Sequence, residues 1–495
     1  MSLDRRAFLT TAASATAAFG SARLLAASGI ATVEPAQGDL VRWLIESDRN
    51  GLVAALAAAV RAGLAYPALL GALAEATARE VRPYPQVGFK YHAFMGLHAV
   101  HSATIAAPTP ERWLPVLWAE DAFKAAQAAQ AREGPAALAP LPERPVPPVD
   151  WAEAALRQAL EQWDAPAADA AVVDLLRAAP RDRLFQPLFH YGARDFRAIG
   201  HKAITVANCH RLLGVVAPEH AEPMLRSVVW ALQNHEGEPN PAASDLGPDR
   251  PWRRNLVLAG PVPGALSPGG PAGDDPVARL LQVLREGSAE DASAALSAEL
   301  DRGVPEADLW TAIFLAAGDL LVKQTGIVAV HANTTANALH YAYAQVGDGQ
   351  TRRLLLLQAA AFMPLFRALL GGDLRPLGID SLTAPEHGAD LARAPEDIFA
   401  TLGGDRLLAA RQTLGYLSTG GAEPPFMALA RRYTRERTHD YHDYKFTEAA
   451  FENAAALVSP WRERYLAAAT LYLNEPADLP NAVVERASSL LSPHP

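Results

Sequence analysis

Apolar residues recur at helical spacing through almost the whole chain from about Asp39 onward, and Ala and Leu dominate this pattern. Alternating β-branched runs, which indicate strands, are scarce, and no glycine-rich turn of the dinucleotide-binding kind is present. Half (50%) of the 495 residues are hydrophobic, which is enough apolar material for a large core. The sequence therefore predicts an all-α protein.

Two stretches rich in proline and glycine interrupt the helical pattern, at 134–149 and 237–275. We expect four parts: a segment at 1–36, an N-terminal helical half at 37–240, a Pro/Gly-rich loop at 241–275 and a C-terminal helical half at 276–495. A long loop in a compact domain often covers a functional site. Trp252 and Arg253 are therefore expected near the centre of the protein.

Similar units recur along the chain. The turn at Gly63 and the helix after it resemble the turn at Gly303 and its following helix. Pairs of histidines nine residues apart recur as well, and they are His92 with His101, His201 with His210, and His331 with His340. Such recurrence predicts repeated helical hairpins packed into one large bundle or short solenoid.

Nine residues along an α-helix amount to two and a half turns, so the two histidines of a pair face opposite sides. One member of each pair can therefore face a common site. His98 lies three residues before His101 and shares its face, and polar residues form stripes on the helix around His331. Each of these histidines has an alternative interpretation as a hydrogen-bonded core residue.

The densest group of polar and aromatic residues lies at 436–448. Glu436, His439 and His442 follow one another at steps of three, so one helix face can carry all three. A carboxylate three residues before a histidine is a spacing used in di-iron and di-manganese bundles, but a full set needs two such motifs and only one is present. The alternative is a solvated charged face.

We predict that imidazoles from at least three of these segments approach within about 4–8 Å in one enclosed pocket that suits iron or another transition metal. The predicted ligands are His98, His201, His331, His439, His442 and Glu436. The residues expected to be catalytic are His442, Lys445, His331 and His98, with Lys445 as a charge stabiliser beside the site.

Three segments resemble motifs of the questin oxidase-like family. Residues 439–449, with a Lys-Phe-Thr-Glu run at 445–448, resemble its C-terminal signature, although His439 is displaced by one position. Residues 330–336 and 92–100 resemble two further motifs in the same order, and the matches span roughly 90–453. The resemblance implies an oxidase of aromatic polyketide-like substrates that inserts oxygen in a Baeyer–Villiger manner, without a recognised flavin fold.

The first residues resemble a twin-arginine export signal. Arg5 and Arg6 precede Phe8 and Leu9, and a run of small apolar residues follows. Such signals export proteins that have already folded. The expectation is therefore a periplasmic or secreted protein that passes through the twin-arginine export machinery and keeps no stable membrane span after cleavage.

Composition excludes other classes of function. The net charge is −10 and no cationic stripe is present, so no nucleic-acid partner is expected. The single cysteine excludes an internal disulfide and a multi-cysteine zinc site. We predict an exported oxidoreductase that acts on an aromatic or other small organic substrate in a histidine-lined pocket. The alternatives are a non-catalytic periplasmic helical-repeat binding protein and a histidine-based hydrolase or lyase.

Overall fold

A computed structural model describes residues 37–83, 87–109, 111–136, 138–233, 238–260, 275–385 and 390–492. Within these ranges the chain is helical and contains no β-strand, which confirms the predicted all-α class. No helix in the described ranges is both long and apolar enough to cross a membrane. The predicted export signal at 1–36 lies outside the described residues.

The α-helices, in chain order, are α2 (Gln37–Glu46), α3 (Arg49–Arg61), α4 (Tyr66–Glu80), α5 (His92–Met95), α6 (Leu97–Ala106), α7 (Leu114–Glu133), α8 (Val149–Gln162), α9 (Ala165–Ala178), α10 (Arg181–Gly192), α11 (His201–Leu212), α12 (Ala221–Leu232), α13 (Arg250–Leu258), α14 (Pro276–Glu286), α15 (Ala289–Asp301), α16 (Glu306–Lys323), α17 (Ile327–Gln345), α18 (Gly349–Ala368), α19 (Ala394–Leu402), α20 (Arg406–Ser418), α21 (Glu423–Arg437), α22 (Tyr441–Ala455), α23 (Trp461–Thr470) and α24 (Ala482–Leu491). Short 3₁₀ helices are η1 (Phe89–Tyr91), η2 (Pro218–His220), η3 (Gly247–Asp249) and η4 (Ile379–Ser381).

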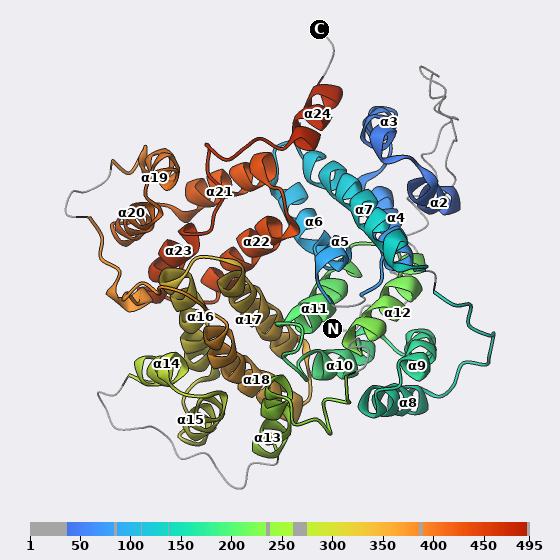
Figure 1. Ribbon diagram of the computed structural model, residues 1–495, viewed down its shortest axis with the longest axis horizontal. Coiled ribbons are helices and arrows are strands. Elements are labelled where there is room, and N and C mark those ends of the chain that lie inside the picture. The colour runs from blue at the N-terminus through green and yellow to red at the C-terminus, as the bar shows by residue number, and fades with distance from the viewer. Residues whose placement is uncertain are drawn as a thin grey trace.

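Inner helices at four positions form a closed ring, which Figure 1 shows around the centre of the molecule. Helix α6, with the short α5 before it, packs against α11, α11 against α17, α17 against α22, and α22 returns to α6. Neighbouring helices pack outside this ring, among them α7, α12, α18 and α23. The bundle is thus a ring with an outer layer, and not an open solenoid.

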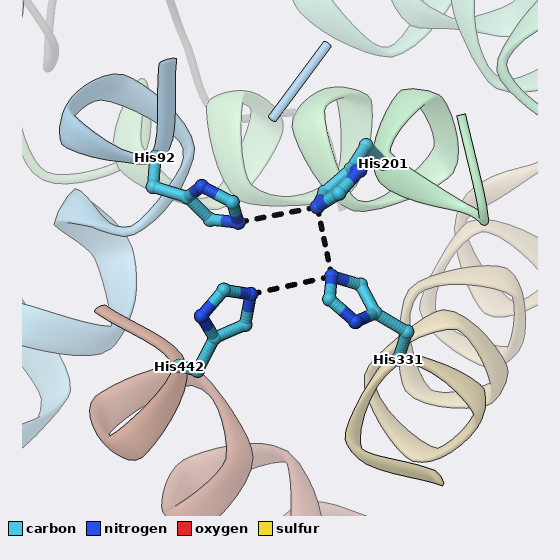
Figure 2. Close-up of side chains that lie close together, drawn as sticks. All are labelled: His92, His201, His331 and His442. Carbon is cyan, nitrogen blue, oxygen red and sulfur yellow. Dashed lines mark hydrogen bonds between the residues drawn. The ribbon is translucent and has the colours of Figure 1, made fainter. Parts of the chain in front are cut away.

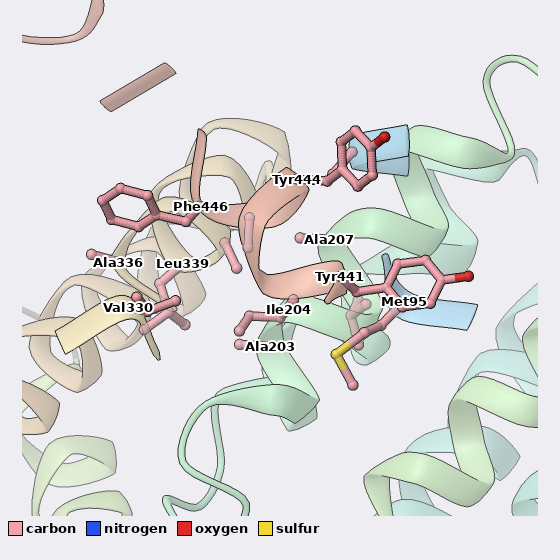
Figure 3. Packing of buried hydrophobic residues seen from close by; sticks show 14 of the residues in the cluster. Met95, Ala203, Ile204, Ala207, Val330, Ala336, Leu339, Tyr441, Tyr444 and Phe446 are labelled. Atoms are coloured by element: carbon pink, nitrogen blue, oxygen red, sulfur yellow. The ribbon is translucent and has the colours of Figure 1, made fainter. Parts of the chain in front are cut away.

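The inner helices are buried because they are apolar or small-sided around most of their circumference. All residues of α11 except Arg211 are buried. Figure 3 shows Ile204, Val330 and Phe446, which come from α11, α17 and α22 and belong to one buried apolar cluster. Polar side chains on these helices therefore lie inside the protein, where they need partners.

The turns that begin the proposed repeat have the same backbone geometry. The N–H groups of Gly63 and Leu64 donate to carbonyl groups at the end of α3, and those of Gly303 and Val304 donate in the same pattern at the end of α15. Both glycines have positive φ, 102° and 77°, a conformation that side chains disfavour. These two turns lead into α4 and α16, so the predicted similarity of the two units extends to the backbone.

Part of the predicted loop at 241–275 is helical, because η3 and α13 lie within it. Pro251 falls in the first turn of α13, where proline is well tolerated. Trp252 is 1% exposed and its ring packs 5.0 Å from that of His190, while Arg253 pairs with Asp245. Trp252 is thus buried and not in open solvent, as expected, but neither residue lines the cavity beside the central histidines described below, so they do not cover it.

Candidate metal centre

Four histidines meet where the inner helices converge, and we call them the four-histidine cluster: His92, His201, His331 and His442. One ring nitrogen of each lies within 4.8 Å of the others. The Nε2 atom of His201 lies 3.1 Å from that of His92 and 2.8 Å from that of His331. The Nε2 atoms of His331 and His442 are 3.3 Å apart. Figure 2 shows the four rings directed towards a common centre.

Three of the four histidines lie at the start of a helix. His92 and His201 are the first residues of α5 and α11, and His442 is the second residue of α22. His331 lies one turn into α17. Backbone N–H groups at a helix start disfavour a protonated imidazole, so this placement favours neutral rings.

Backbone carbonyl groups fix the tautomer of two rings. His92 Nδ1 lies 2.8 Å from the carbonyl oxygen of Phe89, and His331 Nδ1 lies 2.7 Å from that of Ile327. A carbonyl oxygen only accepts hydrogen bonds, so each Nδ1 carries the proton and donates it. In the neutral ring the Nε2 atom then presents a lone pair to the centre of the cluster.

A carboxylate fixes the tautomer of a third ring. His442 Nδ1 lies 2.8 Å from Asp440 Oδ1, and the same oxygen accepts the His442 backbone N–H at 2.9 Å. Although burial alone raises the pKa of Asp440, its hydrogen bond with His442 brings that pKa to about 2. Asp440 is therefore ionised and holds the ring from behind, as carboxylates commonly do behind metal-bound histidines.

Burial also keeps the cluster neutral. It lowers the pKa of His331 to about 3, with the Lys445 ammonium as the second cause. Burial is likewise the first cause of a lowered pKa in the other three histidines of the cluster. Neutral imidazole is the form that binds transition metals.

The cluster fits a bound cation. Without one, the Nε2 lone pairs of the neutral His331 and His442 rings face each other across 3.3 Å in a largely buried environment. Metal–nitrogen bonds of about 2.0–2.1 Å place neighbouring ligand nitrogens about 2.8–3.4 Å apart. The observed separations of 2.8, 3.1 and 3.3 Å match that range. Four imidazoles suit zinc, copper, iron or nickel.

The segment before α11 is built to place His201. Lys202 pairs with Asp195 at 2.7 Å, and both side chains are almost fully buried. Gly200 has a φ of 84°, and a Cβ at that position would lie 1.9 Å from Thr335 Oγ1 on α17. Only glycine lets α11 approach α17 this closely, and this approach brings His201 to His331.

Three predicted ligands, His201, His331 and His442, meet in the cluster, and three others do not. His439 is exposed and donates its Nε2–H to the carbonyl oxygen of Leu479 at 3.0 Å. Glu436 pairs with Arg432 on the surface of α21. The predicted helix through 436–448 ends at Arg437 and a new helix starts at Tyr441, so the three-residue steps do not place these side chains on one face.

His98 also lies outside the cluster. Gly96 separates α5 from α6, and His98 lines a small polar pocket with Asn208, Arg211 and Lys445. Burial lowers the pKa of His98 to about 3. His98 does not line the large cavity described below.

His92 takes the place that sequence reasoning assigned to His98. The histidine repeat could have identified His92 as a ligand, because His92, His201 and His331 are the first members of the three histidine pairs. The second members point elsewhere: His101 contacts the Tyr66 hydroxyl, His210 that of Tyr341, and His340 packs on Trp310. The opposite-face argument for residues nine apart thus describes the pairs on α11 and α17, whereas the break at Gly96 puts His92 and His101 on separate helices.

Lys445 is buried near the cluster, and no carboxylate in the described part of the chain forms an ion pair with it. Its Nζ atom approaches the Met95 sulfur at 3.8 Å. Burial lowers its pKa to about 7. Because Lys445 can lose its charge near neutral pH, it does not prevent cation binding to the adjacent imidazoles.

A cavity of about 1240 Å³ opens above the cluster. All four clustered histidines lie in its wall, together with residues of α7, the segment 87–93 and the segment 479–483. A metal held by the four imidazoles is therefore accessible to a molecule in this cavity.

Comparisons of the chain with protein-family models, with curated proteins and with solved structures gave no match.

Proposed function

We propose that this protein is a metal-dependent oxidoreductase that oxidises an organic substrate in the cavity above the four-histidine cluster. The observation that carries this proposal is the set of four neutral imidazoles whose Nε2 atoms face one point. Oxidation requires a metal that changes its redox state, so iron or copper fits the role better than zinc.

The residues of the chain have separate tasks in this proposal. The four imidazoles hold the metal, and Asp440 orients His442. The apolar cavity wall binds the substrate and keeps water away from the reacting atoms. In an oxidase reaction, two electrons and two protons pass from the substrate to dioxygen, which becomes hydrogen peroxide. The bound metal supplies the one-electron steps.

The family resemblance supports the same class. All three segments that resemble the questin oxidase-like family supply a histidine of the cluster: His92, His331 and His442. Activity on aromatic substrates and export by a twin-arginine signal remain parts of the proposal. Changing Arg5 and Arg6 to lysine tests export, since retained precursor in the cytoplasm is the expected result.

Metal analysis of the full chain, purified after export, tests the function. We expect about one iron or copper per chain, an electron paramagnetic resonance signal, and oxygen uptake with an organic substrate from a panel of phenols and alcohols. His442→Gln should lose the metal, and His439→Gln, at an exposed position three residues earlier, should keep it. A colourless protein with zinc and hydrolytic activity, or equal metal content in both variants, contradicts the proposal.

A further inference from the structure

The wall of the central cavity shows which kind of molecule fits it. At about 1240 Å³, its volume exceeds the roughly 300–1,000 Å³ of sites for drug-sized ligands. Helix α7 lines it with four alanines at helical spacing, Ala122, Ala125, Ala126 and Ala129. Because these side chains are small, the face of α7 leaves room for a long or flat body beside it.

The charged side chains of the cavity wall already have partners. Three ion pairs account for most of them: Arg49 with Asp121, Lys90 with Glu133, and Arg197 with Asp249. Asp440, beside the cluster, holds the neutral His442 through hydrogen bonds to Oδ1. Burying a charge without a partner is costly, and the described wall away from the cluster offers no unpaired charge to a substrate. The body of a bound molecule is therefore uncharged.

Large apolar side chains surround the cavity at its exposed edge. Phe89 is 78% exposed, Leu479 76% and Ile327 48%, and all three line the cavity. Phe89 has a φ of 42°, which is rare for a bulky residue. Exposed apolar side chains that gather at a cavity mouth mark a surface that binds apolar molecules.

We propose that the substrate is an uncharged lipophilic molecule that enters between Phe89, Ile327 and Leu479. Its body lies along the alanine face of α7, and its reacting end lies at the four-histidine cluster. This inference rests on the proposed function for the reaction at that end. The binding itself requires only the cavity.

Calorimetric titration of the purified full chain with four probes tests the inference: dodecanol, butanol, dodecanoate and dodecylammonium. Dodecanol should bind more tightly than butanol by at least about tenfold, because eight additional methylene groups leave water. It should also bind at least about tenfold more tightly than dodecylammonium, since the wall offers no free anionic partner. The affinity for dodecanoate should approach that for dodecanol only in the metal-loaded protein. In protein treated with a chelator, dodecanoate should bind as weakly as dodecylammonium.

Variants of α7 locate the binding site. Ala125→Phe fills the cavity and should weaken dodecanol binding by about tenfold or more. Ala128→Phe, on the exposed side of the same helix, should leave it unchanged. If Ala125→Phe does not fold, Ala129→Leu provides a smaller obstruction with the same expected direction.

Equal binding of dodecanol and dodecylammonium, or unchanged dodecanol binding by the folded Ala125 or Ala129 variant, overturns the inference. These results are independent of metal content. If the protein is purified without iron or copper but binds dodecanol, only the proposed function is contradicted. If it is purified with metal but does not prefer dodecanol to dodecylammonium, only the inference about the substrate is contradicted.

Discussion

The Nε2 atoms of His331 and His442 lie 3.3 Å apart, although both rings donate their Nδ1–H elsewhere, His331 to the carbonyl oxygen of Ile327 and His442 to Asp440 Oδ1. Two neutral rings held in this way have no proton on the atoms that face each other. A shared cation would reconcile this close approach with the two tautomers.

His92→Ala should remove metal binding, and His98→Ala should not, although both residues belong to the same stretch of chain. His92 faces the other imidazoles, with its Nε2 atom 3.1 Å from that of His201, whereas His98 lines a separate pocket. Metal content per chain and circular dichroism of both variants measure this difference. Loss of metal in the His98 variant with full retention in the His92 variant would contradict the assignment of His92 to the metal site.

Asp440→Asn should weaken metal affinity by about 10- to 100-fold, the usual effect of removing a carboxylate behind a metal-bound histidine. An asparagine oxygen still accepts the Nδ1 proton of His442, so the fold should persist. Competition with a chelator of known affinity measures the change. Asp443→Asn is the matched control, because Asp443 accepts from Thr438 and contacts none of the clustered rings. Equal affinities of the two variants contradict the role of Asp440.

Gly200→Ala should destabilise the protein by about 2–4 kcal/mol, since a Cβ there meets Thr335 and the residue has positive φ. Gly372→Ala is the control. It has a φ of 70° but nothing within 4 Å of its Cβ, so it should cost only about 1 kcal/mol. Urea denaturation measures both values. Similar losses in the two variants would mean that the contact with α17 is unimportant.

Glu120→Gln should stabilise the protein at alkaline pH. Glu120 is fully buried, neither of its carboxyl oxygens has a hydrogen-bond partner among the described residues, and burial raises its pKa well above the usual value. Lys124 on the same helix opposes this rise, and Tyr441 on α22 faces the carboxyl group. Because the folded pKa exceeds the unfolded value of about 4.3, wild-type stability falls as pH rises above that value.

The Gln variant lacks this pH-dependent loss. At pH 8 it should exceed wild type in unfolding free energy by about 1–3 kcal/mol, and at pH 4 the difference should vanish. Denaturation at both pH values measures this, with Glu485→Gln, at an exposed position on α24, as the control. A Gln variant with the wild-type pH slope contradicts the assignment of a neutral, buried Glu120.

The fold class followed from the helical period of the apolar residues, and the paired histidines indicated both the repeat and its inward faces. Closure into a ring was not predictable, because it depends on contacts between α22 and α6, which lie far apart in sequence. Local patterns carry no information on such contacts.

The site was predicted in part, and its errors have local causes. The spacing of Glu436, His439 and His442 assumed one helix, but Asp440 accepts the backbone N–H of His442 and starts a new one. An aspartate directly before a helical segment is a known signal for the start of a helix, so this break could have been predicted from the sequence. His98 was preferred to His92 because it shares a helix face with His101. Only the fold shows which face of that segment is turned towards the centre.

A metal ion at the cluster would also have a topological role. The four histidines come from all four inner positions of the ring, from His92 near the start of the described chain to His442 near its end. An ion bound by them would close three long loops of polypeptide at once, as a crosslink does, and its binding energy would be added to the folding energy. No shorter stretch of the chain carries all four histidines. A nascent or truncated polypeptide would lack the centre until α22 docks, so the compartment in which the chain finishes folding would decide which metal it receives.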